Sequence, residues 1–547
     1  MAAALVVALQ TDLTQITSFV RTSQNQYRPI FRLPNEVLAE IFFEVRDSLN
    51  DNTWMRVMSV CRVWRDVAIS VPRLWSTIEL DLDMPNEEEL LKLALHRSKQ
   101  APLDVTVSTR AQALPVHNIL RLDTLAEHVH RFRYVRIRTI HKESLDQISA
   151  AFSAPAPQLK TLRLGRFGST GQHGQIAFPL MFSLDHPKLE RLHCWMLWPE
   201  AVGRTLKFIF LHAPMNKDQQ HQLALAIDRC PNLRQLTLRC VGISPQISQP
   251  TPIPLDGDIH LRLESPSPAN MFYFSLSSSV SLAIDMLTRT HKGAAVFPLD
   301  TSPFPQMNNL RELQINEWNT QPASRSKSII QVTALSATEN VPPFRIYRPY
   351  NPTYRSIASA IAILNALLQP LDLSGIKSVT IKAFDPDPSS PPGQDLIEWK
   401  AFFGVLPSLE TLTIVNSRAS MILGALVPDF VSAWWTERSD VDAEGTLQKG
   451  KRIMVMCTRL KEIVLSNIES PLSADEVMEM VHLRQKHGAP LRDVLVEGAD
   501  STAILSGLPW REPLKLGVVN EGLPVTTADH PDGIPRDDGL DDEVMPQ

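Results

Sequence analysis

The glycine and lysine patterns of this chain do not match the loops that bind phosphates or dinucleotides. Gly450 and Lys451 have the order found at the end of a phosphate-binding loop, but Arg452 stands where that loop needs Ser or Thr. Regularly spaced glycines from Gly165 to Gly174 follow a strand-like phrase, but no helix with room for a pyrophosphate comes after them. We therefore expect a flexible loop there and no nucleotide cofactor.

Signatures of metal sites and of serine nucleophiles are also missing from the sequence. It contains no H-E-x-x-H and no G-x-S-x-G. His128 and His130 would point to opposite sides of a strand, which disfavours a metal pair. The cysteines are widely spaced and form no C-x-x-C pair, which argues against zinc and a disulfide framework. They are Cys61, Cys194, Cys230, Cys240 and Cys457.

Cys61 has no His or Asn near it in a nucleophile arrangement, so we expect a small core hydrophobe there. The sequence therefore predicts a protein that is not an enzyme and holds neither metal nor cofactor. An enzyme with an unrecognised site in residues 241–306 or 319–357 stays open as an alternative. The scattered free cysteines favour a reducing compartment, so we expect a cytoplasmic and/or nuclear, intracellular protein.

Composition is that of an ordinary globular chain of 547 residues, with 44% hydrophobic and 21% charged residues. This length allows two or three domains or one repeat array. A net charge of −5 gives no electrostatic support to nucleic-acid or membrane-surface binding. The apolar run Ala2–Leu9 lacks a basic flank and soon meets Asp12, so we expect no signal peptide. No later run is apolar for the roughly 20 residues that a membrane-spanning helix needs.

Helical periodicity is clearest over residues 32–80. Pro34, followed by an acid, indicates the start of a helix, and apolar residues over 37–45 then form one helical stripe. After a polar break, apolar residues over 54–68 again recur at helical spacing, which predicts a second helix that ends before Pro72. Helices this short cannot bury all of these side chains. Either a partner polypeptide or the rest of the chain covers them, and the pattern alone does not decide between the two.

Three ordered motifs in this segment are L-P-x-E-x-L-x-x-I-F, V-C-R-x-W-R-x-x-A and P-x-L-W. Together they resemble the F-box family, as in fungal-type F-box proteins. The resemblance implies a small all-α bundle that interlocks with the Skp-type linker subunit of a cullin ligase. It implies that the first part of the interface is lined by Leu33, Pro34, Val37, Leu38, Ile41 and Phe42. It implies that Val60, Cys61, Trp64 and Trp75 continue or support that interface. The loop at 46–53 is longer and more polar than is usual in the family.

A short phrase recurs beyond residue 100, beginning at Leu159, Leu233, Leu310 and Leu409, with looser copies at 132, 189, 376, 460 and 491. A bare L-x-x-L-x-L arises by chance about ten times in so apolar a chain, so the pattern alone decides nothing. Pro stands two residues before several of the first leucines, and a charged residue usually follows them. The phrase predicts a short strand with alternate residues facing inward.

Helical patterns lie between these strands. Leu145, Ile148 and Phe152 have helical spacing, and Ser473 with Glu476 forms a capping box. The alternation favours parallel strands with helices outside. The region resembles a degenerate leucine-rich-repeat solenoid. We thus expect an α+β chain in which the N-terminal F-box bundle precedes an irregular α/β, leucine-rich-repeat-like solenoid.

The expected domains are a helical extension over 1–28, the F-box over 29–80, the repeat-like domain over 81–525 and an acidic disordered tail over 526–547. Insertions are expected near 241–306, with alternating runs that could form a hairpin, and near 319–357. The segment 385–393 is expected to be a solvated loop.

The function that these features imply is a non-catalytic substrate adaptor of a Skp-cullin-F-box type ubiquitin ligase, acting in ubiquitin-dependent degradation. Its partners would be the linker, cullin through it, and a client protein that the sequence does not identify. A scaffold acting with the linker outside any ligase is the alternative. Client contacts are expected from a loop cluster of Tyr and Arg, residue types enriched at binding hot spots: Arg345, Tyr347, Arg348, Tyr350 and Tyr354. For this cluster, a solvated or packing role stays open as the alternative. Outward strand positions such as Arg163, Thr237, Gln314 and Thr413 are further candidates, but we prefer to interpret them as solvated sheet residues.

Overall fold

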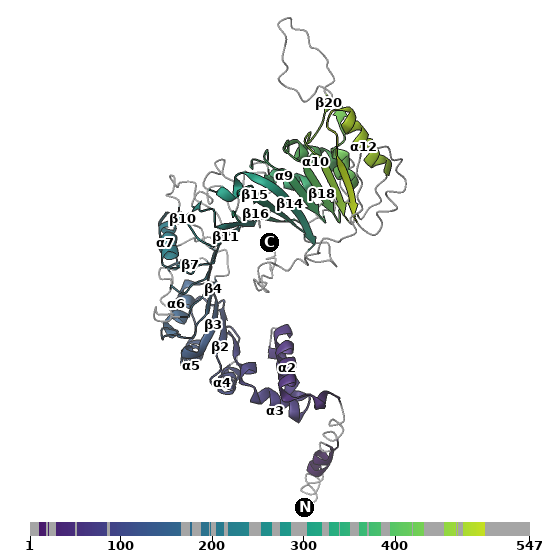
Figure 1. Ribbon diagram of the computed structural model, residues 1–547. Helices are drawn as coiled ribbons and strands as arrows, with labels where there is room; N and C mark the ends of the chain where they lie inside the picture. The colour runs from purple at the N-terminus through teal and green to yellow at the C-terminus, as the bar shows by residue number, and fades with distance from the viewer. Residues whose placement is uncertain are drawn as a thin grey trace, which may run out of the picture. The chain divides into compact units, whose positions relative to one another are not determined.

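The structure is a computed structural model of the chain (Figure 1). It describes residues 10–17, 20, 29–49, 52–84, 88–139, 141–165, 176–177, 188–195, 197–198, 204–212, 217–239, 253–264, 274–285, 304–319, 328–338, 340–350, 360–368, 371–383, 394–417, 419–430, 453–466, 468 and 474–497. Within this part of the chain, no helix combines the length and apolar character that a membrane-spanning segment requires.

Helices near the N-terminus precede a mostly parallel sheet, so the fold is mixed α/β. The α-helices are α2 (Asn35–Leu49), α3 (Arg62–Ser70), α4 (Glu88–Arg97), α5 (Val116–Ala126), α6 (Lys142–Ala151), α7 (Lys217–Asp228), α9 (Ala360–Leu368), α10 (Gln394–Gly404), α11 (Ala419–Ala425) and α12 (Ala474–Lys486). The 3-10 helices are η1 (Pro29–Arg32), η2 (Asn52–Ser59), η3 (Pro72–Trp75), η4 (Val129–Arg131) and η5 (Pro305–Met307).

The strands of the first part of the chain are β1 (Thr77–Asp81), β2 (Leu103–Thr109), β3 (Phe132–Thr139), β4 (Thr161–Gly165), β5 (Ile176–Ala177), β6 (Arg191–Trp195), β7 (Leu197–Trp198), β8 (Phe208–His212), β9 (Gln235–Arg239), β10 (Ile253–Leu255) and β11 (His260–Glu264). Those that follow are β12 (Phe274–Leu276), β13 (Ser281–Asp285), β14 (Leu310–Asn319), β15 (Ser328–Ser336), β16 (Phe344–Tyr350), β17 (Ser378–Lys382), β18 (Thr411–Val415), β19 (Asp429–Phe430), β20 (Ile453–Met454), β21 (Glu462–Ser466) and β22 (Asp493–Glu497).

Helix α2 begins after Pro34, as the sequence predicts, and the N–H groups of Val37 and Leu38 donate to the Pro34 carbonyl. The prediction of one continuous helix over residues 54–68 is wrong. The segment forms two helices, η2 and α3, which are separated at Cys61, where the backbone is extended with φ −162°. The thiol of Cys61 accepts the N–H of Trp64 and so caps the start of α3. Apolar residues recur on both sides of the break because η2 and α3 contribute buried side chains to the same core: Trp54 and Val57 from η2, and Val67 and Ala68 from α3.

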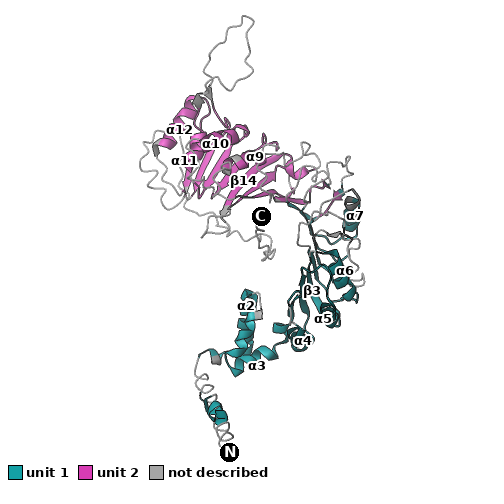
Figure 2. Cartoon of the chain, turned by 180° about the vertical axis from the view of Figure 1, so that it is seen from behind, with its two compact units in different colours: residues 1–253, 258–274 teal, residues 254–257, 275–547 magenta. Residues whose placement is uncertain are grey.

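Two compact units make up the chain (Figure 2): residues 1–253 with 258–274, and residues 254–257 with 275–547. In the first unit the main strands lie in the order β1-β2-β3-β4-β6-β8-β9-β11, all with parallel pairing. Figure 1 shows α5 and α6 along one side of β2 to β4. The strand prediction for the repeated phrase is confirmed, because Leu162 and Leu164 are buried in β4 and Leu236 and Leu238 in β9.

The second unit has the strand order β13-β16-β15-β14-β17-β18-β21-β22. Strand β15 pairs antiparallel with β14 and β16, while β14, β17, β18, β21 and β22 pair in parallel. The region 319–357, expected to be an insertion, therefore supplies β15 and β16 to the sheet. The hairpin expected within 241–306 is wrong: β11 pairs in parallel with β9, and β12 lies beside β10.

The predicted helices at 145–152 and after Ser473 are present as α6 and α12. In the N-terminal extension, the structure describes a helix over residues 10–17. The glycine-rich loop after Gly165, Ser473 itself, the segment 385–393 and the tail over 526–547 lie outside the described residues.

Candidate protein-binding site

The helical module over residues 29–81 has its own apolar core. Leu38 and Phe42 of α2, Trp54 of η2, Ala68 of α3 and Trp75 of η3 are all buried in it. The indole N–H of Trp75 donates to the Ala68 carbonyl at 2.8 Å, so the polar atom of this buried ring is satisfied. The rings of Trp54 and Trp75 meet edge to face at 5.2 Å. This core fixes the positions of the surface side chains around it.

An apolar surface borders this core. Leu33, Ile41 and Trp64 are half-buried and pack on it from outside, and the Trp64 ring lies 5.2 Å from that of Phe42. Three valines remain 42%, 57% and 42% exposed: Val37 on α2, Val60 just before the Cys61 cap, and Val63 in α3. Val37 lies one helical turn from Ile41, and Val60 and Val63 flank Cys61 and Trp64 in the chain. Exposed apolar residues that lie together in this way are candidates for contact with a second protein.

The predicted interface residues fall into three groups. Pro34, Val37 and Val60 are exposed, and Leu33, Ile41, Cys61 and Trp64 are half-buried. The remaining three lie in the core, where they support the surface and do not line it: Leu38, Phe42 and Trp75. Two further exposed apolar residues, absent from the predicted set, are Val63 and Ile30. Val63 would have been included if helix α3 had been predicted to begin after Cys61.

The polypeptide that follows the module also packs on its core. Ala94 of α4 packs on the core, and the Arg97 guanidinium lies 4.4 Å from the centroid of the Trp75 ring. Arg97 also donates to the sulfur of Met58 at 3.9 Å. A cleft of about 30 Å³ remains among Trp54, Trp75, Ile78 and their neighbours, a volume on the scale of a few water molecules. The core is therefore closely packed against the polypeptide that follows the module.

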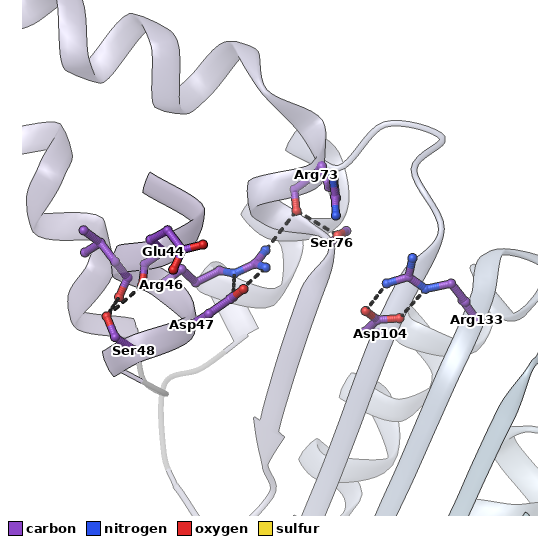
Figure 3. Close-up of polar contacts among 9 residues, drawn as sticks. Glu44, Arg46, Asp47, Ser48, Arg73, Ser76, Asp104 and Arg133 are labelled. Atoms are coloured by element: carbon purple, nitrogen blue, oxygen red, sulfur yellow. Dashed lines mark hydrogen bonds and ion pairs between the residues drawn. The ribbon is translucent and has the colours of Figure 1, made fainter. Parts of the chain in front are cut away.

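Hydrogen bonds continue from the module into the sheet (Figure 3). Arg46 of α2 donates to the Arg73 carbonyl at 3.1 Å, and the Ser76 hydroxyl donates to the same carbonyl at 2.8 Å. The N–H of Asp104 in β2 donates to the Ser76 carbonyl at 2.9 Å. The Asp104 carboxylate in turn pairs with Arg133 of β3. Helix α2 is thus connected to the first strands through backbone and side-chain groups of one short segment.

Phe43 strengthens this connection. Its ring has the Arg46 guanidinium 5.3 Å and the Arg73 guanidinium 5.0 Å from its centroid. Stacking on the ring orients both arginines, and Arg46 also pairs with Asp47 at 2.7 Å.

The client-binding candidates lie differently from the expectation of a loop. Arg345, Tyr347, Arg348 and Tyr350 are all in strand β16, so the expected loop is wrong over these positions. Arg345, Tyr347 and Arg348 are half-buried, and burial lowers the pKa of the Arg348 guanidinium. Because strand residues alternate between faces, Arg345 and Tyr347 share one face and Arg348 lies on the other. Tyr354 lies outside the described residues.

Groups suited to metal or thiol chemistry do not gather in the described parts of the chain, where no cluster of His, Cys, Asp and Glu could hold a metal ion. His128 and His130 flank and enter the turn η4, not a strand as expected, with ring centroids 6.4 Å apart. Burial raises the pKa of the Cys230 thiol to about 11 and that of Cys457 to about 12. These thiols are therefore protonated at neutral pH.

Comparison with protein families matches residues 30–81 to the family described as F-box-like. The matched range covers the core, the apolar surface and the segment that joins β1. A search of curated proteins finds no match to the chain.

Proposed function

Because residues 30–81 form an F-box-like domain, we propose that this F-box protein is a substrate-recognition adaptor of a Skp-cullin-F-box type E3 ubiquitin ligase. The domain docks on the Skp-type linker, the linker joins it to cullin, and the sheet region holds a client protein. The chain itself is a non-catalytic subunit. Its contribution is proximity, which brings the client's lysines near catalytic subunits that other chains supply.

Beside the family match, the structural observation that carries this proposal is the exposure of Val37, Val60 and Val63 close to the half-buried Ile41 and Trp64. Completing the burial of three half-exposed valines contributes on the order of 3 kcal/mol, which corresponds to roughly a hundredfold in affinity. The connections through Arg97 and Arg46 support the second half of the proposal. They join the apolar surface of the F-box-like domain to the first strands of the same unit, which supports a client position on those strands that is defined relative to the linker.

The sheet of the first unit supports client recognition because its main strands follow one another in chain order, and Figure 1 shows the described helices α5 and α6 along one side of β2 to β4. Leucine-rich repeats, the proposed class of this region, use such strand faces and the adjoining loops for binding. The strand phrase at 159, 233, 310 and 409 supports this class.

The test is reconstitution of the full-length chain with a purified Skp-type linker and a cullin. We expect one complex of all three on size-exclusion chromatography. A complex with the linker that leaves cullin unbound favours the alternative, a scaffold acting outside a ligase. Failure of the chain to bind the linker contradicts both functions.

A further inference from the structure

An apolar stripe runs along the helix that comes before the F-box-like domain in the sequence. The structure describes this helix over residues 10–17 and at Val20. Leu13, Ile16 and Val20 remain 67%, 61% and 47% exposed, and we call these three residues the N-terminal stripe. Every other described residue of the helix is exposed as well. The described parts of the chain therefore leave the N-terminal stripe uncovered.

The polar residues of this helix contribute little to its stability. Thr11, Thr14 and Thr17 are β-branched and have low helix propensity. The Thr14 hydroxyl donates to the Gln10 carbonyl at 2.7 Å, a contact that slightly destabilises a helix. Most helical stability in proteins comes from packing of an apolar face. Burial of the N-terminal stripe against a second molecule would supply that stability.

The spacing of the stripe indicates what kind of surface covers it. Its members are three and four residues apart, and the sequence continues this alternation backward to Leu9 and Val6. Projected on a helix at 100° per residue, the five positions span about 80°. A helix that packs on a globular core has a wider apolar face, of about 100° or more. A narrow stripe with a period of 3.5 residues is instead typical of a coiled coil, in which another helix of the same period covers it.

The residues beside the stripe favour a second copy of this chain as that partner. Asp12 is the one charged side chain among the first 20 residues. In a parallel pair of identical helices, Asp12 lies across from Thr17 of the other copy, so no like charges meet. Different partner helices are selected by complementary charges at these flanking positions, and a single acid gives little basis for such selection. A membrane surface is disfavoured because helices that lie on membranes are rich in Lys and Arg, and the first of these here is Arg21.

We propose that two copies of this chain pair in parallel through the N-terminal stripe. Leu13 of one copy packs against Leu13 of the other, and Ile16 and Val20 form the neighbouring layers. The pairing goes beyond the adaptor function and does not depend on it. In an adaptor, it joins two linker-binding and two client-binding surfaces in one particle. A client with two binding segments is then held with a higher effective affinity.

Sedimentation velocity of the full-length chain, without any partner protein, tests the pairing. We expect dimers that dissociate into monomers on dilution, since the stripe is short. A chain that stays monomeric at the highest soluble concentration overturns the proposal.

A double variant tests whether the stripe forms the dimer contact. Leu13→Gln with Ile16→Gln keeps helix propensity but removes two apolar side chains from each copy. We expect the dissociation constant of the dimer to rise about a hundredfold or more. The control is Val116→Gln with Leu120→Gln on α5, where the replaced side chains are 74% and 60% exposed. It should dimerise as the wild type does. Dimers retained in the stripe variant, or lost equally in the control, contradict the assignment.

Two cysteine variants test direct contact between the copies. In the parallel pair, position 13 meets the same position of the other copy, whereas position 15 lies on the outer side. A disulfide requires Cα atoms within about 7 Å of each other. Under oxidation by air with copper phenanthroline, we expect a linked dimer of Leu13→Cys and none of Gln15→Cys. Both variants keep the native cysteines, so any linkage through those is the same in both. Equal yields in the two variants overturn the parallel pairing.

Linker binding, measured on the same preparations, separates this inference from the adaptor function. We expect the Leu13→Gln, Ile16→Gln variant to bind a Skp-type linker as tightly as the wild type does. If this variant stays dimeric and loses the linker, the stripe docks on the linker and the proposal is wrong. Dimers of the wild type that fail to bind the linker would contradict the adaptor function and support the pairing.

Discussion

The Arg97 guanidinium lies over the ring of Trp75, 4.4 Å from its centroid. On its edge the same indole donates its N–H to the Ala68 carbonyl. One aromatic ring thus belongs to the core of the F-box-like domain and is held from outside by helix α4. Through this contact, the F-box-like domain is joined to helix α4 and the first strands of its own unit.

Removing this contact should loosen the junction without unfolding either part. Arg97→Ala loses a partly buried cation–π interaction of about 1 kcal/mol. We expect amide hydrogen exchange over residues 72–81 to become about fivefold faster, the factor that corresponds to this energy. Lys92→Ala on the exposed side of the same helix is the control and should leave exchange unchanged. Equal exchange in the wild type and Arg97→Ala would contradict the role given to Arg97.

Cys61 offers a chemical probe of the apolar surface that we propose binds the linker. It is half-buried, whereas Cys194, Cys230 and Cys457 are buried with raised thiol pKa values. In a Cys240→Ser background, we expect Cys61 to be the first of these thiols alkylated, because reaction needs an accessible thiolate. Bound linker should slow this reaction. Mass spectrometry of the labelled peptides gives the rates, and an unchanged rate at saturating linker would place Cys61 outside the interface.

His212 makes the first unit sensitive to acid. Burial, followed by the charge of Arg239, lowers its pKa to about 3 from an ordinary 6.5. Between pH 3 and pH 6.5 the unfolded chain therefore binds more protons at His212 than the folded chain does. As a result, the free energy of unfolding decreases as pH falls below 6.5. Between pH 7 and pH 5 the loss is at most about 2 kcal/mol. Urea unfolding at both pH values should show a smaller loss in His212→Gln. An equal loss in both proteins would show that other groups cause the acid response.

The sequence predicted the strands in which the same spacing of buried apolar residues recurs along the chain. The phrase beginning at Leu159 or Leu409 becomes a strand because its second and third apolar residues, such as Leu412 and Ile414, point into the core. Strands β15 and β16 lack this phrase, and their antiparallel pairing with β14 and each other depends on tertiary contacts. The break at Cys61 was also not predictable from spacing, because apolar periodicity is continuous on both sides of it.

The sequence predicted the set of residues around the apolar surface of the F-box-like domain. It did not predict which of them are buried in the core and which are exposed. Leu38 and Val37 are adjacent in the motif, yet one is 1% and the other 42% exposed. That difference depends on how α2, η2 and α3 pack, which the motif does not specify.

The affinity of the full-length chain for a purified Skp-type linker tests the account most directly. We expect Val37→Asp with Val60→Asp to weaken binding about a hundredfold or more, because both place an unpaired charge in an apolar contact. Val116→Asp is the matched control, since Val116 on α5 is 74% exposed and lies outside the domain. It should bind as tightly as the wild type. Wild-type affinity in the double variant, with its fold intact by circular dichroism, would contradict the claim that this surface docks the linker.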